Sequence, residues 1–211
     1  MQEIPSKREL NKAKKETAFI NAAERLFKQK GFEGTSIDEV VKEAGLTKRT
    51  LYQYFLSKED LYFAVALKGA KKLFLASEEA IAAGGSALEK IHLANMAHLH
   101  FYLDDIGMFK ILNYKPANQQ NCDASPHFQQ IARYDGMRMA LLMNLVDIGK
   151  VDGSIKTDVD MKKAIFFAFF SAFSLLYTIS STDKSVWTML ELDEAEYLNF
   201  SFDLIINAIR P

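Results

Sequence analysis

The stretch TSIDEVVKEAGLTKRTLYQYFLSK, residues 35–58, predicts two short helices joined by a tight turn. Ser36 and Glu39 have the Ser-x-x-Glu spacing of a capping box, in which each side chain satisfies a backbone N–H of the first helical turn. Gly45 follows this helix, and glycine tolerates the positive φ with which many helices end. Thr47 then stands where the second helix needs an N-cap. The pattern indicates a helix-turn-helix, although a solvated pair of helices would have the same spacing.

The second helix of this pair has an apolar side and a side rich in hydrogen-bond donors. Leu51 and Phe55 lie four residues apart and predict the inward face. The opposite face carries Lys48, Arg49, Tyr52 and Gln53. Lysine and arginine donate to guanine O6 and N7, glutamine pairs with adenine N6 and N7, and a tyrosine hydroxyl reaches phosphate oxygens. This face therefore suits DNA.

The run AAERLFKQKGFEGTSIDEVVKEAGLTKRTLYQYFLSKEDL, residues 22–61, sets this pair of helices between a Gly-Phe step and the Ser-Lys-Glu-x-Leu start of another helix. With its Ala-Gly-Leu turn and Leu-Tyr-x-Tyr-Phe second helix, it resembles the N-terminal domain of the TetR family of bacterial transcriptional regulators. The resemblance extends over residues 19–66, about a quarter of the chain. It implies that the second helix enters the major groove of DNA.

The resemblance also implies roles for individual side chains. Lys48 and Arg49 are implied as the main base readers, with Thr50 and Tyr52 touching bases or backbone. The predicted DNA-binding residues are, in chain order, Thr35, Ser36, Thr47, Lys48, Arg49, Thr50, Tyr52, Gln53, Tyr54 and Lys58. The first two and the last two of these are implied phosphate contacts.

Charge is distributed unevenly along the chain. The formal net charge is −1, but residues 1–58 carry +4 and the remainder carries −5. A basic head on an acidic body is typical of a protein that binds a polyanion through one end. Five basic residues, Lys7, Arg8, Lys12, Lys14 and Lys15, precede the first apolar stripe. They indicate either an arm that reaches toward phosphates or a minor groove, or a segment that only keeps the protein soluble.

The rest of the chain predicts helices rather than strands. Four prolines and ten glycines leave long stretches with helical spacing, and 49% hydrophobic residues suffice for a packed core. We predict an all-α protein of about nine helices, in which a long helix over residues 57–82 connects head and body. Residues 1–56 form the predicted three-helix helix-turn-helix DNA-binding domain. Residues 57–211 form the predicted helical ligand-binding and dimerisation domain.

The segment MKKAIFFAFFSAFSLLYTIS, residues 161–180, is apolar on nearly every side. A membrane span needs about twenty apolar residues, and this run is shorter and interrupted by hydroxyl side chains, so a helix buried on all sides is the favoured interpretation. Its small-residue stripe and a matching stripe near the C-terminus predict a homodimer interface, because TetR-like proteins dimerise through a four-helix bundle of their last two long helices. The predicted interface residues are Ile165, Ala168, Ala172, Leu175, Ile179, Leu198, Phe202, Ile205 and Ile209.

The middle of the chain is the predicted effector domain, where aromatic and methionine side chains with a few polar groups suit an apolar ligand. The same residues at helical spacing would also suit an ordinary core. The predicted ligand-binding residues are His92, Met96, His100, Met108, Phe109, Tyr114, Phe128, Tyr134, Met137, Phe170 and Phe173. The four histidines have no spacing typical of a metal site, so we predict neither a metal nor a cofactor.

The remaining sequence features favour a regulator over an enzyme. The chain has no Gly-rich phosphate loop and no nucleophile with a base placed beside it, so we expect no catalysis. The single cysteine, Cys122, fits a reducing cytoplasm, and the charged N-terminus is unlike a signal peptide. We predict a cytoplasmic homodimeric repressor that binds double-stranded DNA at a palindromic operator and is released by an unknown small ligand. The alternatives are a regulator without a ligand and a helical interaction domain without specific DNA binding.

Overall fold

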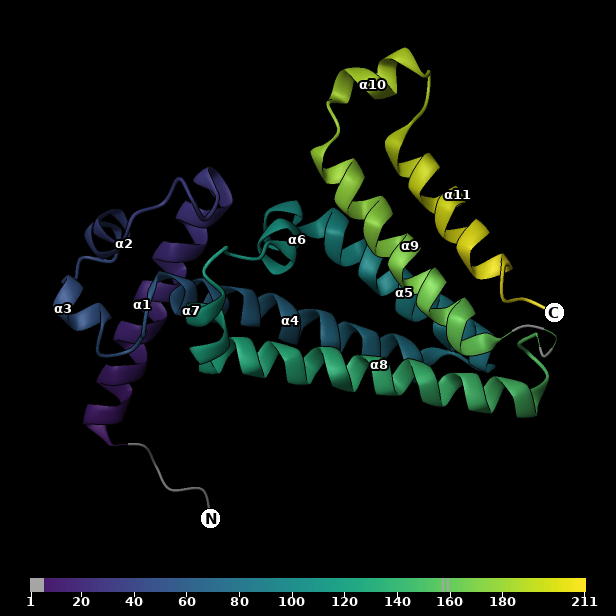
Figure 1. The fold of residues 1–211 in the computed structure, drawn as a ribbon, viewed down its shortest axis with the longest axis horizontal. Helices are drawn as coiled ribbons and strands as arrows, with labels where there is room; N and C mark the ends of the chain where they lie inside the picture. The colour runs from purple at the N-terminus through teal and green to yellow at the C-terminus, as the bar shows by residue number, and fades with distance from the viewer. Residues whose placement is uncertain (1–5, 157, 159) are drawn as a thin grey trace. The chain divides into compact units, whose positions relative to one another are not determined.

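The computed structural model describes residues 6–156, 158 and 160–211, and within these residues it contains eleven helices and no strand (Figure 1). The described part of the chain therefore confirms the all-α prediction. The helices are α1 (Lys7–Lys30), α2 (Ile37–Glu43), α3 (Lys48–Leu51), α4 (Lys58–Ala83), α5 (Ala87–Asp104), α6 (Ile106–Asn113), α7 (Gln119–Ala124), α8 (Pro126–Asp152), α9 (Met161–Ser181), α10 (Lys184–Met189) and α11 (Glu194–Asn207).

Two short helices account for the difference from the nine predicted. Asn118 caps α7 and Asp183 caps α10, each through its side chain. Both helices have only six residues, which is too short for an apolar periodicity to predict them. The N-cap of α9 is Asp160.

The chain divides into two compact units. One comprises Met1–Ala70 with Gly107–Arg133, and the other comprises Lys71–Ile106 with Tyr134–Pro211. Helices α4 and α8 each contribute residues to both units. The units thus differ from the predicted domains, whose boundary lies between residues 56 and 57.

The first unit has an aromatic core built around Tyr62. The Tyr62 ring meets the rings of Phe27 and Phe32 edge-on, with centroids 4.9 and 5.1 Å away. Its hydroxyl donates a 2.8 Å hydrogen bond to the carbonyl oxygen of Ile111. Burial raises the pKa of Tyr62, as expected for a phenol whose ionised form would be shielded from water. This core fixes α1 and α4 beneath the helix-turn-helix.

The second unit has an aliphatic core, and α11 packs against both α5 and α9. Figure 1 shows α9 and α11 running side by side. The buried residues at the centre of this core are Ala87, Ile91, Ala94, Leu142, Leu145, Val146, Ile155, Met161, Ile165, Ile206 and Ile209. Helix α9 is long and apolar enough to cross a membrane by length and composition, and 28% of its most apolar window is buried. Four of its large apolar side chains, Phe166, Phe167, Phe170 and Tyr177, are exposed.

Candidate functional site

The helix-turn-helix is held by the caps that its sequence predicts. The Glu39 N–H donates to Ser36 Oγ at 3.2 Å, and the Ser36 N–H donates to Glu39 Oε2 at 2.9 Å. Gly45 has a φ of 65°, so glycine avoids the strain that a side chain would create at this turn. The Thr50 N–H donates to Thr47 Oγ1 at 3.2 Å and starts α3. The recognition helix is therefore short and fixed at its first residue.

The face of α3 expected to read bases is open to solvent. Lys48, Arg49, Tyr52 and Gln53 are all exposed. The Lys48 Nζ lies 2.8 Å from Asp38 Oδ1, and this hydrogen bond raises the pKa of Lys48. Among the described residues no carboxylate forms an ion pair with Arg49. Arg49 is thus the cation on this face most ready to donate to a base edge.

All four predicted phosphate contacts have partners within the chain, and the Ser36 side chain is held by its capping hydrogen bonds with Glu39. Thr35 is buried, and its Oγ1 donates to the Gly31 carbonyl oxygen at 2.8 Å. That side chain closes the loop between α1 and α2, so its predicted phosphate contact is corrected: the hydroxyl is not available. Lys58 Nζ lies 4.1 Å from the centroid of the Phe32 ring, a cation–π geometry. Tyr54 is half-buried with its ring 6.1 Å from that of Phe19. Phosphate binding by Lys58 and Tyr54 stays a prediction.

A buried acidic residue, Asp60, anchors the segment that follows the recognition helix. Its Oδ2 accepts the Leu56 N–H at 3.0 Å. Its Oδ1 accepts hydrogen bonds from Ser125 Oγ at 2.6 Å and His127 Nδ1 at 2.7 Å. Burial pushes the pKa of Asp60 upward, but the hydrogen bonds from His127, Ser125 and Leu56 outweigh it and the net pKa is lowered. The start of α8 is thereby tied to the end of the helix-turn-helix.

The predicted ligand-binding residues are divided between the two units. Met108, Phe109, Tyr114 and Phe128 belong to the first unit, and the other seven belong to the second. Met108 and Phe109 are buried in the core of the first unit, and a ligand role for them stays a prediction. Met137 and Phe170 are exposed. These patterns of aromatic and methionine residues mark core and surface as readily as a pocket.

Two predicted ligand residues line a groove on the second unit, while others have ring partners. Met96 and His100 border a groove of about 300 Å³ between α4 and α5. The Tyr134 ring lies 5.4 Å from that of Phe74. Phe173 stacks on Tyr177, and His92 is half-buried. The groove beside Met96 and His100 gives a ligand room.

A polar cluster inside the second unit was not predicted as a ligand site. Ser77, Asn95, His98 and Arg138 line a cavity of about 20 Å³ with Ile81, Ala94, Leu142 and Phe169. The Arg138 guanidinium lies 5.5 Å from the centroid of the Phe169 ring. Its NH2 is 3.8 Å from Asp135 Oδ1, a carboxylate whose side chain is 60% exposed. A guanidinium in an apolar helical body with so distant a counter-charge is costly to bury.

The electrostatics of this cluster match a site for negative charge. Burial lowers the pKa of Arg138, and Asp135 offsets this only in part. Burial and the neighbouring Arg138 guanidinium lower the pKa of His98 to about 3, so His98 is neutral near pH 7. The sequence does hold a signal for Arg138, which shares a helical face with the buried Leu142 and Leu145.

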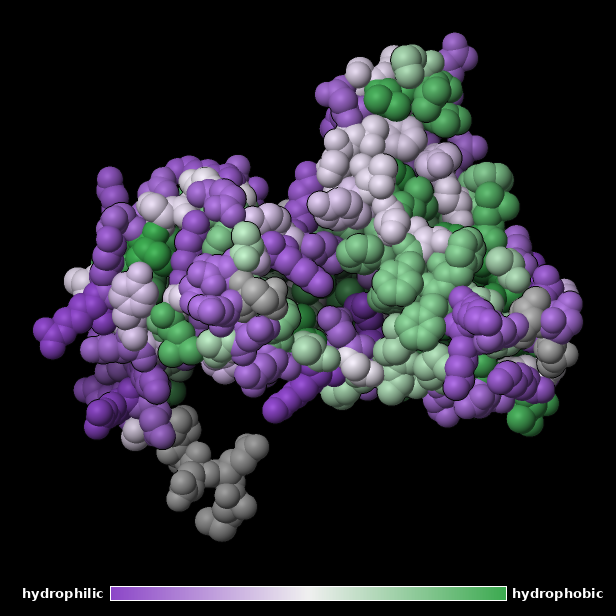
Figure 2. Space-filling view, viewed as in Figure 1, coloured by the Kyte–Doolittle hydropathy of each residue, from purple (hydrophilic) through white to green (hydrophobic). Residues whose placement is uncertain are grey.

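The apolar stripe assigned to the dimer interface is covered within the chain. Ile165, Ala168, Ala172, Ile179, Leu198, Phe202 and Ile209 are buried, and Leu175 and Ile205 are partly buried. The seven buried residues are corrected to core residues of the subunit, because they have no surface left for a second copy, whereas an interface role for Leu175 and Ile205 stays a prediction. The exposed apolar side chains of α9 and α11 are Phe166, Phe167, Phe170, Tyr177, Phe200 and Leu204. We call these six residues the C-terminal apolar face, and Figure 2 shows hydrophobic side chains gathered over these helices.

Comparison with known proteins agrees with this geometry. Residues 19–65 match the family described as bacterial regulatory proteins, tetR family. The chain is 24% identical over 145 residues to the fatty acid metabolism regulator protein of Bacillus subtilis (strain 168), covering 69% of this chain and 73% of that protein. It is 22% identical over 156 residues to the transcriptional repressor KstR2 of Rhodococcus jostii (strain RHA1), covering 74% and 75%.

A solved structure extends the likeness over nearly the whole chain. The transcriptional regulator FadR from Bacillus subtilis, in complex with stearoyl-CoA, superposes with a TM-score of 0.69 at 21% identity, covering 92% of this chain and 99% of that one. The matched family and these relatives are regulators of transcription, not enzymes. The chain is therefore a DNA-binding transcription regulator that carries a tetR-family domain at residues 19–65 within the fold of TetR regulators.

Proposed function

We propose that the protein is a homodimeric repressor that works in the cytoplasm, binds a palindromic operator and is released by a small ligand. The observation that carries the dimer is the C-terminal apolar face, on which Phe167, Phe170 and Phe200 are 65%, 56% and 59% exposed. Large apolar side chains grouped on two adjacent helices mark an interaction surface. Two copies of α9 and α11 would form a four-helix bundle around a twofold axis, and that symmetry calls for two half-sites.

The polar cluster around Arg138 supports the ligand. An anionic group on an apolar molecule would neutralise the guanidinium, while Ile81, Leu142 and Phe169 would meet its apolar part. The cavity of about 20 Å³ has room for about one water molecule. A ligand must therefore move the helices that line it. The relative crystallised with stearoyl-CoA binds a ligand of this kind.

The same cluster suggests how release would occur. Ser77 lies on α4 and Arg138 on α8, and both helices also contribute to the unit that holds the helix-turn-helix. A ligand that separates them would change the arrangement in which the two recognition helices of a dimer meet DNA. Repression would end because the heads no longer fit successive major grooves. The name of one relative, the repressor KstR2, favours repression as the output.

Selection from a random duplex library tests the DNA half of the proposal. The protein should enrich a sequence with two inverted half-sites about one helical turn apart. Enrichment of a single half-site would contradict the dimeric arrangement. If the protein enriches no sequence, the proposed operator binding is wrong and an interaction domain without specific DNA binding remains.

Arg49→Ala should weaken binding to the selected duplex and relax the preference at one base position by about 1–3 kcal/mol. Lys58→Ala is the control: a cation at a phosphate should weaken selected and random duplexes by the same factor. The measurement is fluorescence anisotropy on the selected duplex, its single-base variants and a random duplex. If Arg49→Ala lowered the affinity for selected and random duplexes equally, a base-reading role for Arg49 would be contradicted.

Arg138→Met should abolish binding of an anionic ligand while keeping the apolar packing. The probes are straight-chain fatty acids, their CoA thioesters and alcohols of matched length. A ligand at a hundred times its Kd stabilises by about 2.7 kcal/mol, so the acids or thioesters should raise the Tm of the native protein by about 5–10 °C. Arg138→Met should lose most of that shift. Equal stabilisation by the alcohols would contradict a role for the charge, and stabilisation by no compound would favour a regulator without a ligand.

A further inference from the structure

The first three turns of α1 form a helix that the core does not need. Ser6 caps it through a full capping box with Glu9, and α1 runs from there without a break. From Lys7 to Lys15 every residue is exposed, and the first buried side chain of α1 is Phe19. Helices in proteins owe most of their stability to a packed face. Because this extension is capped but packs against nothing within the described residues, we expect its role to be the binding of another molecule rather than stabilisation of the fold. We call residues 7–15 the arm.

The arm is strongly basic and its charges are not neutralised within the described chain. It carries Lys7, Arg8, Lys12, Lys14 and Lys15 against one acidic residue, Glu9. Glu9 is engaged by Ser6, whose side-chain and backbone hydrogen bonds lower its pKa. Among the described residues no carboxylate forms an ion pair with any of the five cations. Such a surface attracts an anion.

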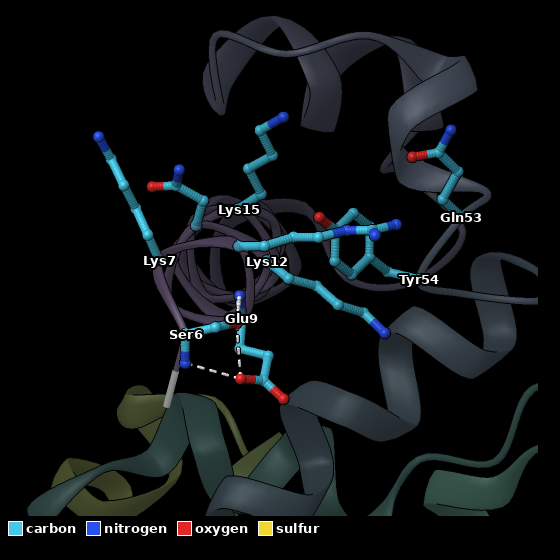
Figure 3. Close-up of a pocket in the computed structure, with 9 residues that line it drawn as sticks. Ser6, Lys7, Glu9, Lys12, Lys15, Gln53 and Tyr54 are labelled. Carbon is cyan, nitrogen blue, oxygen red and sulfur yellow. Dashed lines mark hydrogen bonds between the residues drawn. The ribbon is translucent and has the colours of Figure 1, made fainter. Parts of the chain in front are cut away.

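The arm borders the same groove as Gln53 and Tyr54, the residues that follow α3 and its C-cap. This groove has a volume of about 960 Å³ and is lined by Ser6, Lys7, Arg8, Glu9, Asn11, Lys12, Lys15, Gln53 and Tyr54. Figure 3 shows the side chains of α1 on one side of it and those of Gln53 and Tyr54 on the other. Four cations thus lie across a groove from Gln53, two residues beyond the last residue of α3.

We infer that the arm binds the phosphate backbone of DNA beside the bases that the recognition segment reads. The inference rests on the proposed function, since it needs the protein to be seated on a duplex. Lysine and arginine side chains on an exposed helix neutralise phosphates without reading sequence. The arm therefore adds affinity and fixes the protein's position on the DNA, while base preference stays with α3.

The composition of the arm favours DNA over the other common polyanionic surface, an acidic membrane. A helix that binds lipid needs a broad apolar face opposite its charges. Between Lys7 and Lys15 the one large apolar side chain is Leu10, which is 48% exposed. The adjoining groove residues, Gln53 and Tyr54, are polar and belong to the DNA-reading segment. A duplex seated on α3 brings phosphates to this groove, whereas the described residues that line it include no aliphatic side chain that would enter a bilayer.

The test replaces the four groove cations together, Lys7→Gln, Arg8→Gln, Lys12→Gln and Lys15→Gln, in the full-length protein. Glutamine keeps the helix and removes the charge. The matched control removes four exposed charges elsewhere, from Lys71, Lys110, Lys115 and Arg133. The probes are the duplex selected from a random library and a random duplex of equal length. Titrations over a range of salt concentrations give the slope of log K against log salt.

The arm variant should bind both duplexes about 10–100-fold more weakly and keep the ratio between them. Its salt slope should become shallower by about 0.9 for each phosphate that the arm no longer neutralises, or about 2–4 in total. Ethylation interference should lose signals at phosphates beside the half-site. The control variant should change affinity by less than threefold.

The outcomes separate this inference from the proposed function. Native affinity and slope in the arm variant, with specific binding intact, would overturn the arm's role alone. The same would follow if the control variant lost as much affinity as the arm variant, or if the arm variant lost binding only to phosphatidylserine vesicles. Failure of the native protein to prefer any duplex would instead overturn operator binding. Circular dichroism and urea unfolding of both variants should match the native protein, because the altered side chains are exposed.

Discussion

The double variant Phe167→Glu with Phe170→Glu should be monomeric and should bind the selected duplex about 100-fold or more weakly than the native protein. Both rings are more than half exposed on α9, so the change costs the isolated subunit little. In a dimer both rings would be buried, and two carboxylates placed there without partners would each cost several kcal/mol. The second DNA-binding head would then no longer be held near its half-site.

Sedimentation equilibrium and anisotropy titrations measure the two effects. The control pair is Leu75→Glu with Val151→Glu, which are exposed apolar residues at 56% and 89% on other helices. This pair should leave both the dimer and the DNA affinity unchanged. A dimer that survives the phenylalanine substitutions would contradict the proposed interface. Recovery of the native protein in the membrane fraction would instead mean that lipid covers α9.

The parts that could be predicted from sequence depend on contacts between near neighbours. The capping box of Ser36 and Glu39, the positive φ of Gly45 and the cap at Thr47 each involve residues within one or two turns. Such contacts leave a fixed spacing in the sequence. The helix-turn-helix was therefore predicted with its correct limits, apart from the early end of α3 at Leu51.

Seven of the predicted interface residues are core residues of the subunit, a difference that arises because two apolar stripes on one helix look alike in sequence. Periodicity shows that α9 has two faces to cover, but it does not show which of them the same chain covers. The stripe through Ala168 and Ala172 meets the core of the subunit, and the one through Phe166 and Phe170 is left exposed. Small residues let helices approach closely in a core as well as between subunits.

The buried polar groups were missed because their partners are distant in sequence. Asp60 meets Ser125 and His127, more than sixty residues away. The only local pattern around Asp60 is the Ser57-x-x-Asp60 spacing of a helix cap. The structure shows it as a hydrogen bond from the Asp60 N–H to Ser57 Oγ. Nothing in that spacing predicts burial.

Asp60→Ala should lower the free energy of unfolding by about 3–5 kcal/mol, because each buried hydrogen-bonding group left without its acceptor costs about 1–3 kcal/mol. The substitution leaves the Leu56 N–H, Ser125 Oγ and His127 Nδ1 without their acceptor. Urea unfolding followed by circular dichroism measures the loss. Asp104→Ala is the control: its side chain is 65% exposed, with Lys72 3.7 Å away, so it should change stability by about 1 kcal/mol or less.

The same substitution should also change how stability depends on pH. The hydrogen bonds hold the folded pKa of Asp60 below its ordinary value of 3.8. A carboxyl group with a depressed folded pKa stabilises the fold above its unfolded pKa, and this contribution is lost as pH falls through the folded value. The native protein should therefore lose stability below about pH 4 more steeply than Asp60→Ala does. Parallel curves would show that folding leaves the pKa of Asp60 unchanged.

A double-mutant cycle then separates the pair from the rest of the network. Asp60→Asn keeps the shape and one acceptor oxygen, so it should cost less than Asp60→Ala, at about 1–3 kcal/mol. If the His127 contact carries much of the stabilisation, His127→Gln combined with Asp60→Asn should cost less than the two single changes added together. Because Oδ2 holds the Leu56 N–H just after the recognition segment, these variants should also weaken binding to selected and random duplexes alike. Strict additivity of the two changes would mean that Asp60 and His127 stabilise the fold independently. Native DNA affinity in these variants would mean that the contact between Asp60 and the start of α8 does not position the helix-turn-helix.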